Sequence, residues 1–121
     1  MNIPAISDSE WKIMKVLWNE NPKTATEIME ELEKETNWKP TTVKTLLSRL
    51  VKKEAITYEN KNRKYYYTPL IGEEQCVIEE SKSFLQRVYN GGVKSLVANF
   101  LHMEKLSKED VEELKKILED K

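Results

Sequence analysis

Few residues in this sequence have the types and spacing that catalysis requires. The chain contains one histidine, His102, and one cysteine, Cys76, and neither stands in the spacing of a zinc site. Its three glycines build no phosphate-cradling loop. We expect His102 to be solvated near a helix end and Cys76 to be a small core or interface residue. The sequence therefore predicts a protein that is not an enzyme, with no catalytic residues, no metal, no cofactor and no small-molecule substrate.

The chemistry that the sequence does offer is the binding of a polyanion. The whole chain has 20 basic and 21 acidic residues, a net charge of −1. Residues 39–67 nevertheless hold eight basic and two acidic residues, a balance of +6, whereas residues 71–121 have a balance of −3. This concentration of positive charge favours a nucleic-acid surface. The same lysines also fit an ordinary solvated face, so their geometry has to decide.

The residues from Thr41 to Glu54 supply that geometry. At helical spacing, Val43, Leu46, Leu47, Leu50 and Val51 fall within an arc of about 140°. The polar face of this helix is made of Thr41, Thr42, Lys44, Thr45, Ser48, Arg49, Lys52 and Lys53, with no acidic residue among them, since the single Glu of the segment is its last residue, Glu54. A surface helix usually mixes Glu with Lys for i, i+4 pairing. The absence of Glu here is explained if the face lies against phosphates.

Two helices are predicted before this one, and each begins with a capping box. The first begins at Ser7, with Glu10 three residues later, and runs until Asn19 to Pro22. The second begins at Thr24, with Glu27 three residues later, and ends near Thr36 and Asn37. Pro40 then suits the first position of the third helix, because its missing N–H would be unpaired there.

A hairpin with a basic tip is predicted after the third helix. Its strands are Ile56–Tyr58 and Tyr65–Thr68, which are rich in β-branched and aromatic residues. The segment between them, residues 60–64, contains Lys61, Arg63 and Lys64, and its asparagines tolerate the positive φ of a turn. Three helices followed by a two-stranded ribbon is the order of a winged helix-turn-helix.

The three consecutive tyrosines of the second strand allow two interpretations. Tyr65, Tyr66 and Tyr67 could form a platform for stacking single-stranded bases. Alternation along a strand sends the middle ring to the opposite face, which favours packing against the core.

Residues 71–121 form a second predicted domain, after a first domain of residues 1–70. The pattern is again helical, interrupted at Gly91 and Gly92, and the last helix begins with a capping box of Ser107 and Asp110, preceded by Leu106 as a hydrophobic staple. We expect that last helix to bury Val111, Leu114, Ile117 and Leu118. Fifty-one residues are too few for an independent core, yet the segment carries many large apolar side chains. They pack either on the first domain or, as we favour, on a second copy of the chain. The residues expected at the dimer contact are Phe84, Leu85, Val88, Leu96, Val97, Phe100, Leu101, Leu114, Ile117 and Leu118.

Several motifs in a fixed order resemble one family, the BlaI/MecI penicillinase repressors. They are ISDSEWKIMKVLW, NWKPTTVKTLLSRLVKK, KYYYTPL, FLQRVYNGGVKSLVANFL and LSKEDVEELKKIL, which together span nearly the whole chain. The resemblance implies a mainly α fold with a small β-wing, namely an N-terminal winged helix-turn-helix plus a C-terminal helical dimerisation domain. It also implies a homodimer on palindromic double-stranded operator DNA.

The resemblance extends to the candidate site residues. The positions that match the family's DNA-contacting motif are Thr41, Thr42, Lys44 and Thr45. The polar face adds Ser48, Arg49 and Lys52, and the wing tip adds Lys61, Arg63 and Lys64. Threonine side chains can contact thymine methyls or phosphates, and the long basic side chains can reach guanine edges or phosphates. Thr41 and Lys44 stand where other members often have Lys and Arg, so operator preference is expected to differ in detail.

The family's mode of induction implies a cleavage site. In this family, a membrane-bound β-lactam sensor with a metalloprotease domain leads to cleavage of an Asn-Phe bond in the repressor. The Asn99-Phe100 bond of this chain resembles that bond. Phe100 also lies on an apolar helical stripe, so a core role is an alternative that is compatible with cleavage. A copper-responsive branch of the superfamily carries C-terminal cysteines, and this chain ends without any.

The expected function is repression of β-lactam resistance genes, that is, an operon of a β-lactamase or penicillin-binding protein and its sensor. Two alternatives stay open: a repressor of the same family acting on a non-β-lactam operon, and a winged-helix module that binds an acidic protein. No run approaches the roughly 18 apolar residues of a membrane helix, and the N-terminus lacks a signal-peptide pattern. We therefore expect a cytoplasmic protein.

Overall fold

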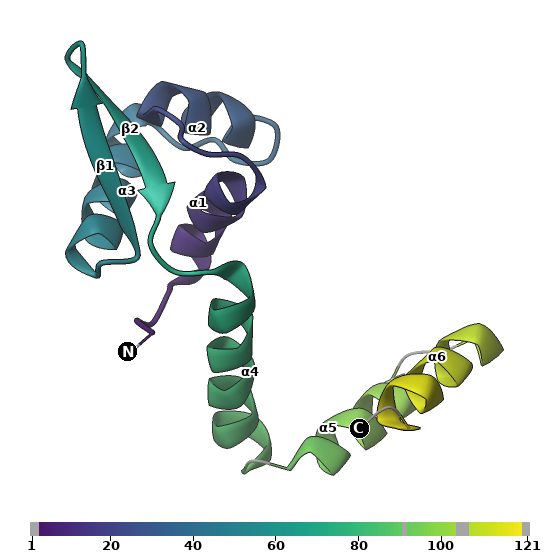
Figure 1. Ribbon diagram of the computed structural model, residues 1–121. Coiled ribbons are helices and arrows are strands. Elements are labelled where there is room, and N and C mark those ends of the chain that lie inside the picture. Colours follow the sequence, from purple (N-terminus) through teal and green to yellow (C-terminus); the bar gives the residue numbers. More distant parts are fainter. Residues whose placement is uncertain (1–2, 91, 104–106, 120–121) are drawn as a thin grey trace. The chain divides into compact units, whose positions relative to one another are not determined.

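The computed structural model describes residues 3–90, 92–103 and 107–119, and it is mainly helical with one small antiparallel sheet (Figure 1). This confirms the predicted fold class. The chain divides into two compact units, Met1–Glu80 and Ser81–Lys121. Each unit is described by itself.

The first two helices begin where the capping boxes predict. Helix α1 (Asp8–Asn19) has Ser7 as its N-cap, and α2 (Ala25–Leu32) has Thr24. In both, the N3 glutamate accepts a hydrogen bond from the backbone N–H of the cap residue. The predicted end of α2 near Thr36 is wrong, because the helix stops four residues earlier. The Thr36 hydroxyl donates to the Leu32 carbonyl at 3.0 Å, a side-chain bond that competes with continued helix.

Helix α3 (Pro40–Lys52) begins with proline in its first turn, as predicted. Its C-terminus has the hydrogen bonds of a Schellman motif: the N–H of Ala55 donates to the Leu50 carbonyl, and that of Glu54 to the Val51 carbonyl. Glu54 therefore takes a positive φ of 62°, a conformation that usually calls for glycine. The helix ends two residues before the predicted Glu54. The sequence does not reveal this end, because no glycine marks the residue with left-handed conformation.

The hairpin is present and longer than predicted. Strands β1 (Ile56–Lys61) and β2 (Lys64–Pro69) pair antiparallel, with Ile56 opposite Pro69 and Lys61 opposite Lys64. The outer edge of β2 forms one further bridge, in which Lys23 and Tyr67 exchange both backbone hydrogen bonds at 3.1 and 2.8 Å. We call this hairpin the wing.

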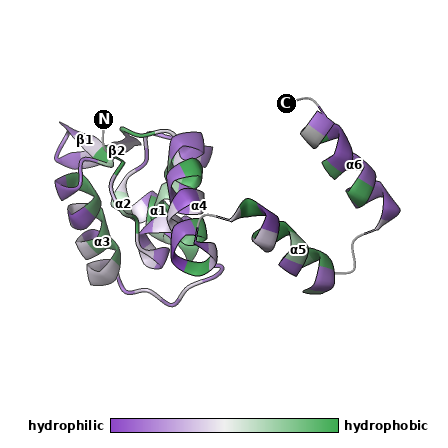
Figure 2. Ribbon diagram, turned by 90° about the horizontal axis from the view of Figure 1, so that it is seen from below, coloured by the Kyte–Doolittle hydropathy of each residue, from purple (hydrophilic) through white to green (hydrophobic). Residues whose placement is uncertain are grey.

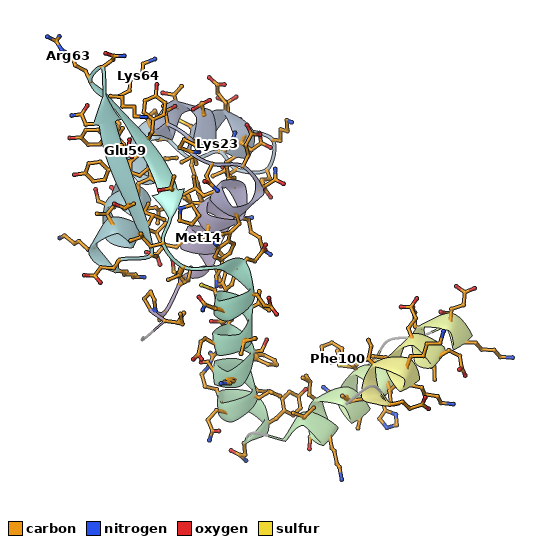
Figure 3. The ribbon with its side chains drawn as sticks, viewed as in Figure 1. Met14, Lys23, Glu59, Arg63, Lys64 and Phe100 are labelled. Atoms are coloured by element: carbon orange, nitrogen blue, oxygen red, sulfur yellow. The ribbon has the colours of Figure 1, made fainter. Side chains whose placement is uncertain are left out.

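The core of the first unit lies where α1, α2, α3 and the base of the wing meet. The buried apolar side chains come from all of these elements, and Met14, labelled in Figure 3, is completely buried. The core residues are Ile6, Ile13, Met14, Val16, Leu17, Ile28, Leu32, Val43, Leu46, Leu47, Leu50, Ala55, Ile56, Ile71 and Cys76.

The first turns of α4 (Glu73–Tyr89) belong to this core. Ile71 and Cys76 are buried in it, and the indole N–H of Trp18 donates to the Ile71 carbonyl at 2.9 Å. The Lys15 ammonium also pairs with the Glu73 carboxylate. The first compact unit therefore includes the first turns of α4.

The second unit is built from the rest of α4, α5 (Val93–Met103) and α6 (Lys108–Glu119). The predicted capping box is present: the N–H of Ser107 donates to the Asp110 carboxylate, and the N–H of Asp110 donates to the Ser107 hydroxyl. Leu106, the expected staple, lies outside the described residues. Helices α5 and α6 each carry apolar stretches between hydrophilic ones (Figure 2).

The burial expected of the last helix is not found within one chain. Val111 is half-buried, but Leu114 and Ile117 are exposed, since no described element of the same chain covers them. The side chain of Leu118 lies outside the described part of the structure.

Candidate nucleic-acid interface

Burial of one side of α3 directs its polar side outward. Val43, Leu46, Leu47 and Leu50 are buried against the core, which fixes the rotation of the helix about its axis. All seven α3 residues proposed from sequence are exposed, namely Thr41, Thr42, Lys44, Thr45, Ser48, Arg49 and Lys52. The exposed side of α3 is therefore a surface of hydroxyls and cations.

Two grooves flank this surface. One of about 950 Å³ lies between the start of α2, α3 and the wing, and Lys44, Ser48, Arg63 and Lys64 all line it. The structure thus brings cations of the helix and of the wing to one groove.

A smaller groove of about 350 Å³ lies toward the start of α1. Thr41, Thr42, Thr45 and Arg49 line it together with Ser9. Within the helix, the Thr45 hydroxyl donates to the Thr41 carbonyl at 2.8 Å, which leaves its oxygen free to accept. The remaining predicted residues, Lys52 and Lys61, are exposed but line neither groove.

The tip of the wing concentrates three cations around one tight turn. The turn residues Asn62 and Arg63 both have positive φ, 52° and 67°, as a two-residue type I′ hairpin requires. The sequence predicts this conformation for asparagine but not for arginine. Arg63 and Lys64 project from the tip (Figure 3), and Lys61 lies directly opposite Lys64 in the ladder. The Lys61 ammonium is 3.3 Å from the Glu59 carboxylate.

The larger groove also contains residues that were not predicted to contact double-stranded DNA. Thr24, Glu27, Asn60 and the three consecutive tyrosines line it beside the cations. Thr24 and Glu27 were recognised only as a capping box, since their position beside α3 depends on packing that no local pattern encodes. Hydrogen bonds from Thr24, together with the charges of Lys23 and Lys64, lower the pKa of Glu27, so the groove holds one carboxylate among its cations.

Lys53, which was predicted to lie on the polar face of α3, does not lie there. Lys53 turns inward, where its ammonium pairs with the carboxylate of Glu10 and donates to the Ala5 carbonyl at 2.9 Å. The Glu10 side chain is only 1% exposed. Lys53 follows the last residue of α3 as its C-cap, so helical periodicity does not fix its direction. The placement of Lys53 on the polar face is therefore corrected.

The tyrosines of β2 have different surroundings. Tyr67 is half-buried and packs against the core, as expected, but Tyr65 is exposed and does not. Tyr65 stacks on Tyr58 of β1 instead, with ring centroids 4.5 Å apart and planes inclined by 17°. The core-packing interpretation is correct for Tyr67 and wrong for Tyr65.

The candidate reactive residues lie where the sequence predicts. Cys76 is buried in the core, and this burial raises the pKa of its thiol, which disfavours the reactive thiolate. His102 is exposed in the last turn of α5. Among the described residues there is no cluster of three or more His, Cys, Asp or Glu side chains that could hold a metal ion. The same residues include no helix long and apolar enough to cross a membrane.

The second unit exposes most of the apolar residues predicted for dimerisation. Phe84, Val88, Val97, Phe100, Leu101, Leu114 and Ile117 are exposed, and Leu85 and Leu96 are half-buried. No side chain of α5 is fully buried. Asn99 and Phe100 both lie on α5 and are exposed, and the Asn99 amide donates to the Tyr89 hydroxyl at 2.8 Å.

Comparison with known proteins relates this geometry to one family. The family model described as Penicillinase repressor matches residues 6–120. The penicillinase repressor of Bacillus licheniformis is 43% identical over 118 residues, covering 98% of this chain and 92% of that protein. The methicillin resistance regulatory protein MecI of Staphylococcus aureus (strain N315) is 39% identical over 116 residues, covering 96% and 94%.

A solved structure shares the fold of the first unit. It is the solution structure of the monomeric form of Bacillus licheniformis BlaI in complex with the blaP half-operator. The match has a TM-score of 0.53 and 41% sequence identity, and it covers 60% of this chain and 89% of that one.

Proposed function

Because the chain belongs to the penicillinase repressor family, we propose that it is a DNA-binding transcriptional repressor. In this proposal it acts as a homodimer on a palindromic operator upstream of β-lactam resistance genes. The regulated operon encodes a β-lactamase or a penicillin-binding protein together with its sensor.

One observation carries the proposal: the exposed side of α3 has no acidic residue and adjoins the cationic wing. Lys44 and Ser48 of α3 share a groove with Arg63 and Lys64. The major groove of B-DNA admits a helix, and the flanking phosphates attract cations beside it. In the related BlaI, the matched fold is in complex with a half-operator.

The proposed contacts follow from chemistry and position. Lys44 and Arg49 are the residues best placed on the exposed side for guanine edges or phosphates, while Thr41, Thr42, Thr45 and Ser48 meet thymine methyls or phosphate oxygens. Lys52, Lys61, Arg63 and Lys64 supply phosphate contacts. The carboxylate of Glu27 opposes the charges of Lys44, Arg63 and Lys64 in the larger groove, which disfavours indiscriminate binding to phosphate.

The dimer is proposed to form through the second unit. Exposed apolar patches of this kind mark protein interfaces in soluble proteins. Two copies related by a dyad would present two α3 helices to half-sites about 34 to 36 Å apart, one turn of DNA.

Relief of repression is proposed to follow proteolysis between Asn99 and Phe100. The family resemblance supplies the bond, and its place on an exposed α5 fits a cut that removes dimer contacts. The signal would come indirectly from a membrane-bound β-lactam sensor and its protease.

A titration of the purified protein tests the repressor. The probe is DNA from upstream of its own gene, with a scrambled duplex as competitor, at two salt concentrations. We expect specific, dyad-dependent binding, with a log-log salt slope of about 0.9 per phosphate contact. Weak binding that ignores sequence would favour an acidic protein partner, and specific binding to a different operator would favour another regulated operon.

Two variants connect this binding to α3. We expect Lys44→Ala and Arg49→Ala to cost about 1 to 3 kcal/mol where the side chain reads a base, or to weaken all sequences alike where it binds phosphate. Lys34→Ala is the control, since Lys34 is exposed after α2 and lines neither groove. Unchanged binding in both α3 variants would remove α3 from the interface.

A further inference from the structure

The wing carries a chain of tyrosine contacts that leads from the core toward its tip. Tyr67 packs against the core, and its backbone is fixed to Lys23. Tyr58 pairs with Tyr67 across the two strands, and the centroids of their rings are 5.8 Å apart. Tyr65 then stacks on Tyr58 at 4.5 Å, two residues from Arg63 and next to Lys64. We call Tyr58, Tyr65 and Tyr67 the tyrosine ladder.

Three features destabilise the pairing of the two strands beyond Tyr58 and Tyr67, at the tip of the wing. An isolated two-stranded hairpin is at best marginally stable in water. Its last ladder pair places Lys61 opposite Lys64, and like charges in that position repel. The turn also holds Arg63 at a φ of 67°, which is unfavourable for a side chain without the local bonding of asparagine. Some other interaction must hold the tip in place.

We propose that the tyrosine ladder is that interaction, and that Tyr58 and Tyr65 are positioning residues for the three wing cations when the protein binds DNA. This inference rests on the proposed function. In this proposal the tyrosine ladder acts through ring stacking and not through the hydroxyls. Tyr58 and Tyr65 are 41% and 45% exposed, and their contact is between the two stacked ring faces. Stacked aromatic pairs stabilise beyond their buried area.

The first test uses the free protein and does not depend on DNA. Trypsin cleaves after Lys61, Arg63 and Lys64 only when the tip opens, and the rate follows the open population. Removing one stacked ring in Tyr65→Ala is expected to raise this rate about two- to tenfold. Tyr65→Phe, which keeps the ring, should match the unsubstituted chain. Thr57→Ala is the control on the opposite face of the hairpin. An unchanged cleavage rate in Tyr65→Ala would overturn the proposal that the tyrosine ladder holds the tip of the wing.

The second test measures operator binding as a function of salt. Tyr65→Ala removes no charge, yet it should lower the log-log salt slope by about 0.9 for each wing cation that is no longer held at phosphate, up to about 2.7. Tyr65→Phe should keep the salt slope of the unsubstituted chain, because the stacked ring remains. If Tyr65→Phe loses affinity as Tyr65→Ala does, with an unchanged slope, the hydroxyl contacts DNA and the ladder is wrong.

The two tests separate the ladder from the repressor. If the unsubstituted chain binds no DNA specifically, the proposed function fails, while the trypsin result still decides whether the ladder holds the tip. Circular dichroism of each variant establishes that the rest of the chain is folded, as expected for substitutions at exposed positions.

Discussion

Lys52 and Lys53 are neighbours in sequence with different surroundings. Lys52 is exposed at the end of α3, whereas Lys53 is paired with the buried carboxylate of Glu10 and its side chain is 34% exposed. Breaking a buried ion pair by removing one partner leaves an uncompensated charge, whereas an exposed lysine contributes little to stability. The two residues therefore form a matched pair for separating folding from DNA binding.

We expect Lys53→Met to lower the free energy of unfolding by about 3 kcal/mol and to leave the salt slope of DNA binding unchanged. Lys52→Met should change stability by less than about 0.5 kcal/mol and lower the salt slope by about 0.9. Urea denaturation and operator titrations at several salt concentrations measure the two effects. A reduced slope in Lys53→Met, measured where the variant is folded, would mean that Lys53 reaches phosphate after all.

Glu10 should make the stability of the first unit depend on pH. Burial alone would raise its pKa, but the hydrogen bonds from Lys53 and Ser7 outweigh it and hold the pKa below the ordinary 4.5. The carboxylate therefore binds protons less readily in the folded than in the unfolded chain. Its stabilising contribution is complete above pH 4.5 and is lost as the pH falls through the folded-state pKa.

The matched variant for this pH effect is Glu10→Gln, which keeps a side-chain acceptor for the capping box. Denaturation at pH 7 and at about pH 3 should show a smaller loss of stability in Glu10→Gln than in the unsubstituted chain. An equal loss in both proteins would assign the acid sensitivity to other carboxylates.

At the residue scale, the sequence predicted what periodicity encodes and missed what depends on distant partners. The exposed side of α3 followed from the spacing of Val43, Leu46, Leu47 and Leu50. The burial of Glu10 did not follow, because its partner Lys53 lies 43 positions later and helical pattern says nothing about that contact. The stack of Tyr58 on Tyr65 was missed for a related reason, since it needs the register of the two strands.

At the element scale, helix starts were predicted well, and α1 ends at Asn19 as predicted, but the ends of α2 and α3 were placed too late. Each predicted capping box, at Ser7, Thr24 and Ser107, is present. The starts are encoded by side chains that bond within four residues. The end of α3 is encoded by backbone hydrogen bonds around Glu54, where no glycine marks the left-handed residue.

The start of α4 has a consequence for dividing the chain. Ile71 and Cys76 are buried in the core of the first unit, and Trp18 bonds to the Ile71 carbonyl. We expect a fragment of residues 1–80 to be more stable than one of residues 1–69 by about 2 to 4 kcal/mol, because the shorter one loses both buried side chains.

Urea denaturation of the two fragments measures this difference. Both should sediment as monomers, since they lack α5 and α6, and Cys76→Ala in the longer fragment should account for part of the gap. Equal stability would show that the first turns of α4 only lie on the surface of this unit.

At the scale of the whole molecule, the described residues of the second unit leave most of their large apolar side chains exposed. This unit spans Ser81–Lys121, and no side chain of α5 is fully buried. A segment of this size buries too little surface to be stable alone. A second copy offers the same apolar surface, and a self-complementary patch is what a two-fold dimer requires.

Val97→Asp tests this dimer because Val97 is exposed on α5 and would place a charge in the apolar contact. We expect the dimer dissociation constant to rise at least about 100-fold, since an unpaired charge is costly to bury. Ser95→Asp introduces the same charge on the same helix and should have a much smaller effect. Sedimentation equilibrium of the full chain measures both, and a dimeric Val97→Asp would move the interface away from α5.

The proposed dimer would also determine how tightly the protein holds a palindromic operator. Two linked α3 helices bind two half-sites with an affinity well above that of one, because the second contact is intramolecular. Val97→Asp should therefore reduce binding to the full palindrome and leave binding to a single half-site unchanged. A cut between Asn99 and Phe100 would interrupt the same helix and should have the same signature. If cleaved protein kept full affinity for the palindrome, proteolysis of α5 could not be what relieves repression.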